Sequence, residues 1–142
     1  MFLPDDLLFN VPENMLSESS TGAFARRVYV MVLEEPAFPG NREFLSKVLS
    51  AVQLDLAKDT LFAEIPVNVS ASFVTELKSK QPEQVLVFGL LPADLGLAIE
   101  ASVYQPVVFY GVQWLFADPL SALEYDKQKK SLLWSALKQM FM

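Results

Sequence analysis

The feature that most constrains the fold is an apolar run that leads directly into a turn and then a helix. Val28 to Leu33 is rich in β-branched residues, and an acidic, proline-containing stretch, Glu34 to Gly40, follows it. Residues 42–52 then place apolar side chains at helical spacing. Open α/β sheets build ligand crevices from this order of strand, turn and helix. The sequence therefore predicts a pocket at the carboxyl end of a central strand.

Further strand-like runs follow, and each is short, apolar and bounded by turn residues. They are residues 60–65, 84–89, 106–111 and 113–116, the last two flanking a bend or tight turn at Gly111. The run 60–65 is expected at an edge of the sheet, because Glu64 interrupts it and Pro66 follows. The run 84–89 is almost entirely apolar and ends in glycine, which is typical of a buried strand in a parallel sheet.

Helical segments are expected between and after these runs. They are residues 42–52, 70–80, 92–101 and a last helix that begins at Asp126, whereas residues 54–59 are expected to form a connection. Strands that alternate with helices are typical of a mainly parallel sheet covered on both faces. The sequence thus predicts an α/β fold, a three-layer α/β/α sandwich with a mainly parallel central sheet of about four strands. In such a fold, the loops 34–41, 89–94 and 116–120 are expected to lie near one another at one edge.

The 142 residues are enough for one domain with a single core, preceded by an arm. Residues 26–142 are assigned to the α/β/α domain, and residues 1–25 to an N-terminal arm. The arm carries large apolar side chains that so short a segment cannot bury alone: Phe2, Leu3, Leu7, Leu8 and Phe9. It either folds back on its own domain or orders on a partner protein. These five residues are therefore the candidate partner-binding residues.

The composition excludes several kinds of chemistry. Histidine and cysteine are absent, so the commonest general base, the commonest nucleophile and the usual transition-metal ligands are missing. The net charge of −6, from 17 acidic and 11 basic residues, disfavours autonomous binding of nucleic acid. No apolar run approaches the roughly 20 residues that cross a bilayer, and Asp5 and Asp6 stand where a signal peptide needs basic residues. We expect a soluble cytoplasmic protein with no membrane association and no cofactor.

The surface is expected to have an apolar patch, because hydrophobic residues make up 52% of the chain and charged residues 20%. One local cluster is basic, and it consists of Lys127, Lys129, Lys130 and Lys138 in the last helix. The ordinary interpretation of such a cluster is a solvated helix face. Trp114 and Trp134 are expected to be core or interface anchors.

A candidate pocket is expected where the loops after the strands meet. Its predicted residues are Glu34, Glu35, Pro36, Phe38, Asn41, Asp118 and Pro119. The carboxylates could serve as an acid–base pair or bind a hard metal ion such as Mg²⁺. The alternative is that these acids are solvated or cap helices, and adjacent Glu34 and Glu35 point to opposite sides of a strand. No catalytic or metal-binding residue is assigned, since the serines have no histidine partner and no phosphate-binding loop is present.

Several segments resemble the uracil-DNA glycosylase-like superfamily, over about residues 26–141. Val30 to Pro36 is similar to the strand and Glu-x-Pro turn that opens a glycosylase active site, and residues 85–89 look like the later strand that ends in glycine. The closing loop and final helix of the superfamily have counterparts in Asp118-Pro119-Leu120 and in residues 130–138. The closest resemblance is to the psi subunits of the bacterial DNA polymerase III clamp loader, which share this fold and lack the activity.

The departures from the superfamily decide which function the resemblance implies. Asp118 stands where the glycosylase pattern has its histidine, and residues 37–40 replace the water-activating polar residue of the first loop. Base excision also needs a positively charged surface that faces DNA, whereas this chain is acidic. The resemblance therefore implies a non-catalytic protein-interaction subunit in DNA replication. Its arm is expected to bind the clamp loader, and its domain a chi-like subunit.

Two alternatives stay open from the sequence. A divergent enzyme of the glycosylase superfamily, or a damaged-base binder, would use Glu34 or Asp118 to polarise a water molecule. A generic small-ligand pocket would use the same loops. An adaptor is expected to co-purify with replication proteins, whereas an enzyme is expected to release uracil from DNA.

Overall fold

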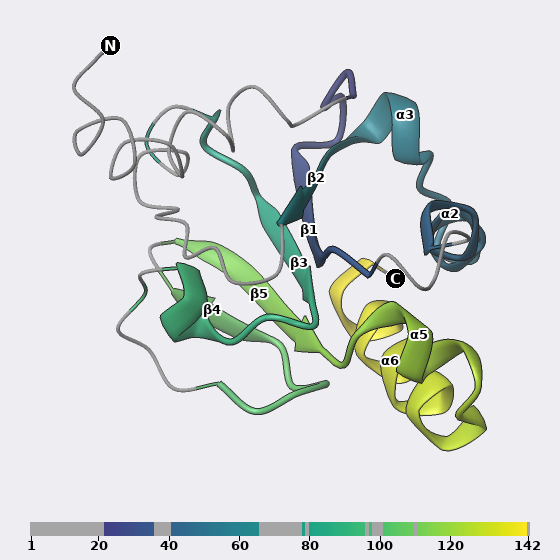
Figure 1. Ribbon diagram of the computed structural model, residues 1–142. Coiled ribbons are helices and arrows are strands. Elements are labelled where there is room, and N and C mark those ends of the chain that lie inside the picture. The colour runs from purple at the N-terminus through teal and green to yellow at the C-terminus, as the bar shows by residue number, and fades with distance from the viewer. Residues whose placement is uncertain are drawn as a thin grey trace, which may run out of the picture.

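One mixed β-sheet forms the centre of the protein (Figure 1). The structure is a computed structural model that describes residues 22–35, 41–65, 78, 80–95, 97, 101–109 and 111–141. Its strands are β1 (Val28–Leu33), β2 (Thr60–Ile65), β3 (Gln84–Phe88), β4 (Val107–Phe109) and β5 (Val112–Ala117). They lie in the order β2-β1-β3-β5-β4, and all neighbours are parallel except β4, which is antiparallel to β5. The predicted α/β fold with a mainly parallel sheet is confirmed, with five strands where about four were expected.

The predicted positions of the strands within the sheet are also confirmed. β2 lies at one edge of the described sheet, and Glu64 within it is exposed to solvent. β1 lies between β2 and β3, and Val30 stands in register with Phe62 on one side and Leu86 on the other. The bend expected at Gly111 joins β4 to β5. The first three parallel strands therefore occupy the places that their apolar composition indicated.

The helices agree with the sequence in two places and differ in three. They are α2 (Asn41–Ser50), α3 (Leu56–Asp59), α5 (Leu120–Glu124), α6 (Lys127–Phe141) and the 3-10 helix η1 (Pro92–Leu95). α2 and α6 confirm the expected helices. α3 lies within the expected connection, α5 lies where a loop was expected to end, and the expected helix 92–101 is described only as the single turn η1, with Leu97 and Ala101 outside helical backbone. Most of the expected helix 70–80 lies outside the described residues.

Local capping fixes where two of the helices begin. The side chain of Asp126 accepts hydrogen bonds from the backbone N–H groups of Gln128 and Lys129, both at 3.0 Å. Asp55 does the same at the start of α3, for Ala57 and Lys58 at 2.9 Å. The first N–H groups of a helix have no acceptor within the helix, so these carboxylates supply one. The predicted start of the last helix at Asp126 is thus confirmed.

The two faces of the sheet are buried by different parts of the chain. Val28, Val30 and Val32 of β1 face a core cluster that includes residues of α2, α3, α5 and α6. In Figure 1, α2, α5 and α6 lie together on one side of the sheet, to the right of it. Tyr29 and Met31 face the opposite cluster, to which η1 and its neighbours contribute. All the α-helices in the core clusters of the described chain therefore cover one face. The predicted helical layer on the other face is not seen among the described residues, where η1 and loop residues pack against the sheet.

The start of the described chain is held against the domain. The backbone N–H groups of Ala23 and Ala25 donate to the carbonyls of Ala57 and Lys58 of α3, both at 2.8 Å. The five apolar side chains of the predicted arm, Phe2, Leu3, Leu7, Leu8 and Phe9, lie outside the described residues.

Candidate functional site

The loops that leave the carboxyl ends of β1, β3 and β5 meet at one edge of the sheet, as predicted. The N–H of Gly89, just after β3, donates to the carbonyl of Ala117 at the end of β5 (2.9 Å). A Cβ atom at Gly89 would lie 3.0 Å from the Cβ of Leu33 and 3.3 Å from the Cα of Pro119. Gly89 has a φ of +84°, a backbone conformation that favours glycine. This glycine therefore permits the close approach that brings the candidate site together.

Glu35 holds the start of α5 from a distant part of the sequence. Its carboxylate accepts hydrogen bonds from the hydroxyl of Ser121 and, at 3.2 Å, from the backbone N–H of Ser121. Ser121 lies in the first turn of α5, and the residue before the helix is Pro119, which makes no side-chain cap. Glu35 supplies the acceptor that the helix start would otherwise lack. One of the predicted pocket acids thus acts as a helix cap.

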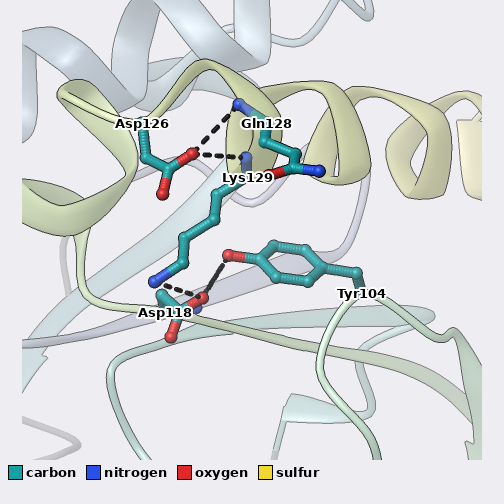
Figure 2. A network of polar contacts seen from close by, with 5 residues as sticks. All are labelled: Tyr104, Asp118, Asp126, Gln128 and Lys129. Carbon is teal, nitrogen blue, oxygen red and sulfur yellow. Dashed lines mark hydrogen bonds and ion pairs between the residues drawn. The ribbon is translucent and has the colours of Figure 1, made fainter.

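Asp118 joins two other elements through a polar network (Figure 2). The hydroxyl of Tyr104 donates to Oδ2 of Asp118 at 2.5 Å. The Nζ atom of Lys129, on α6, lies 3.6 Å from the same carboxylate oxygen. The side chain of Asp126 accepts a hydrogen bond from the backbone N–H of Lys129 in the first turn of α6. The Lys129 side chain extends from this turn to Asp118 (Figure 2). The carboxylate therefore links β5, the segment before β4 and the last helix.

The environment of Tyr104 keeps its hydroxyl in the protonated form. Burial, and next the hydrogen bond to Asp118, raise the pKa of Tyr104 well above its usual range. The backbone of Tyr104 has a φ of 63°, and its N–H donates to the carbonyl of Phe116 at 2.8 Å. Tyr104 is therefore a fixed hydrogen-bond donor to Asp118 at neutral pH.

We predict that Tyr104→Phe lowers the free energy of unfolding at pH 7 by about 1 kcal/mol, because a partly exposed hydrogen bond to a carboxylate is lost. The folded-state pKa of Tyr104 is raised, so its contribution is fully present below the unfolded pKa of about 10 and is lost as the pH rises above it. Urea unfolding at pH 7 and pH 11 measures this. The difference between wild type and Tyr104→Phe should shrink at pH 11, and an unchanged or larger difference would contradict the assignment.

The structure brings the predicted pocket residues together only in part. Glu35 and Pro119 both adjoin the start of α5, whereas Asp118 belongs to the network with Tyr104. Glu34 is half-buried, and its N–H donates to the carbonyl of Ile65. Pro36 and Phe38 lie outside the described residues, and so does the side chain of Asn41, the first residue of α2.

Three residues that contact these acids could not be predicted from the sequence. Tyr104, Ser121 and Lys129 supply the partners of the two acids. Lys129 belongs to the basic cluster of the last helix, but nothing in the sequence of that cluster indicates which lysine pairs with Asp118. Tyr104 and Ser121 lie in segments without a recognisable pattern, because their roles depend on contacts made across the fold.

Two hollows in the described surface lie away from these acids. An open hollow of about 830 Å³ is bounded by residues of α2 and of the α3 region, among them Arg42, Ser46 and Asp55. A smaller apolar groove of about 130 Å³ runs between α2 and α6. Neither hollow is lined by a described member of the predicted pocket.

Neither a scan against models of protein families nor a search of curated proteins found a match to the chain.

None of the helices in the described part has the length and apolar character that crossing a membrane requires. Among the same residues, no cluster of three or more acidic side chains is placed to hold a metal ion.

Proposed function

We propose that this protein is a non-catalytic interaction subunit of the DNA replication machinery, similar to the psi subunits of the polymerase III clamp loader. The observation that carries the proposal is that the acids at the carboxyl edge of the sheet contact residues of the fold. Glu35 caps α5, and Asp118 accepts from Tyr104 and pairs with Lys129. Both carboxylates thus contribute to the fold. In the sequence analysis, a structural role was the alternative to an acid–base role.

The chemistry of Asp118 supports the same proposal. A general base needs a lone pair directed at the proton that it removes. The Oδ2 atom of Asp118 is already directed at the Tyr104 hydroxyl and at Lys129. By the resemblance, this residue occupies the position of the catalytic histidine of the glycosylases. A carboxylate committed to two partners is a poor substitute for that histidine.

In this proposal the fold is of the uracil-DNA glycosylase-like, three-layer type, although the α-helices of the described chain cover only one face of the sheet. The parallel strands β1, β3 and β5, with α6 as the last helix, follow the order that the resemblance implies. In this proposal the protein works in the cytoplasm without a cofactor, the arm of residues 1–25 binds the clamp loader, and the domain binds a chi-like subunit.

The experiment is co-purification of the tagged full-length chain from its native host. We predict that clamp-loader proteins co-purify and that deletion of residues 1–12 lowers their recovery at least about tenfold, as expected when the main anchors of an interface are removed. A control of unchanged length replaces Phe2, Leu7 and Phe9 with serine, and it should give the same loss. Equal recovery with and without the arm, at unchanged thermal stability, would contradict the proposal.

A further inference from the structure

The groove between α2 and α6 is an apolar surface that the fold leaves open. Its walls are Phe44 and Val48 on α2, Ala51 just after this helix, and Leu133, Trp134 and Leu137 on α6, with Lys130 at its rim. Trp134 is 38% exposed. A volume of about 130 Å³ accommodates one large apolar side chain. The described surface therefore contains an apolar cleft between two helices.

The two helices that form this groove carry a net charge opposite in sign to that of the whole chain. α2 and α6 together contain six basic residues and one acid, Glu43, although the net charge of the chain is −6. The Nζ atom of Lys130 lies 6.0 Å from the ring centre of Phe44, and that of Lys138 lies 5.7 Å from the ring centre of Trp134. Both lysine residues are exposed. Two ammonium groups thus stand beside the aromatic walls of an apolar cleft, in a protein that is otherwise acidic.

We infer that this groove binds an acidic amphipathic helix of a partner protein. A large apolar side chain of that helix would fill the cleft beside Trp134, and flanking carboxylates would pair with Lys130 and Lys138. The sign of the local charge selects an acidic partner and disfavours a basic one. A nucleic acid fits less well, because the walls between the two lysines are apolar and would desolvate a phosphate backbone.

This inference deepens the proposed function and rests on it for the existence of a protein partner. The groove is lined by residues from 44–51 and 130–137, none of which belongs to the arm segment 1–25. Deletion of the arm tests the proposed function, and variants of the groove test the inference. The failure of one is therefore distinguishable from the failure of the other.

The test uses the full-length chain and two synthetic helical peptides as probes. Both carry Leu and Phe at helical spacing on one face, one with flanking Glu residues and the other with Lys in their place. Fluorescence anisotropy of the labelled peptides should show the Glu peptide binding at least about tenfold more tightly at low salt. Trp134→Ala and Lys130→Glu should each weaken that binding about tenfold. Lys58→Glu, an equal change of charge at an exposed site on α3, should leave it within about twofold.

Several results would overturn the inference. These are equal binding of the two peptides, and binding that Trp134→Ala and Lys130→Glu leave unchanged while circular dichroism shows both variants folded. Binding of the Glu peptide only after deletion of residues 1–12 would mean that the chain's own arm occupies the groove. A dimer that Trp134→Ala dissociates would assign the groove to a second copy. Tighter binding of an oligothymidine than of the Glu peptide would assign it to nucleic acid.

Discussion

Gly89→Ala is expected to lower the free energy of unfolding by about 2–4 kcal/mol, from a left-handed backbone combined with a forced contact. Gly89 has a φ of +84°, and an added Cβ would lie 3.0 Å from Leu33 and 3.3 Å from Pro119. The neighbours on one side are the backbone and ring of a proline, which have little room to move. The loss of stability therefore measures how closely the three loops approach one another.

Gly111→Ala is the matched control for this prediction. Gly111 also has a positive φ, +71°, but an added Cβ there would meet no atom within 4 Å. Its replacement should cost only the backbone strain, about 1–2 kcal/mol. Urea unfolding at pH 7 measures both variants. Equal losses at the two positions would mean that the loops do not approach each other as closely as described.

Trp114→Ala is expected to cost about 3–5 kcal/mol, the usual range for removing a large aromatic side chain from a core. Trp114 on β5 is completely buried, and its ring stacks on that of Phe116 with 6.0 Å between centres. Its indole N–H donates to the carbonyl of Phe109 at 3.0 Å, so the variant also loses a hydrogen bond that ties β4 to β5. The variant should unfold at a much lower urea concentration than the wild type.

Trp134→Ala separates the role of the core from that of the surface. Trp134 is partly exposed at the α2–α6 groove, and its loss should cost less than about 1 kcal/mol, as for most surface substitutions. The near-ultraviolet circular dichroism signal should fall mainly in Trp114→Ala. Similar destabilisation by the two variants would show that Trp134 is a core residue and would remove the basis for a binding groove.

The strands could be predicted closely because their signals are local. β1 and β2 have the predicted bounds, and β3 ends one residue before the predicted Gly89. Continuous apolar runs with β-branched residues, ended by proline or glycine, identify buried strands without information on the rest of the fold. Glu64 also indicated correctly that β2 lies at an edge. The pairing of β4 with β5 was indicated only by the bend at Gly111.

The helix α5 could not be predicted, because its start depends on a distant residue. α5 has five residues, too few to show a helical period, and its start is capped by Glu35, which lies 86 residues earlier. α5 is also held between α2 and α6 by tertiary contacts. The predicted loop ended at Leu120, and no helix was predicted for the four residues that follow it.

The candidate site was located by topology, but the roles of its residues were not. The order of strands and helices placed Glu35 and Asp118 at one edge of the sheet, and the close contacts of Gly89 confirm that the loops meet there. What each acid does depends on Ser121, Tyr104 and Lys129, which reach it from other elements. A hydrogen bond between distant segments leaves no periodic pattern in the sequence.

The measurement that tests the central claim most directly is an assay of base release by the purified full-length chain. The claim is that Glu35 and Asp118 stabilise the fold and do not activate water. Single- and double-stranded oligonucleotides that contain uracil serve as substrates, with Asp118→Asn in parallel. We predict no release of uracil above the protein-free control for either protein. Release by the wild type that falls in Asp118→Asn would contradict the claim and identify an enzyme.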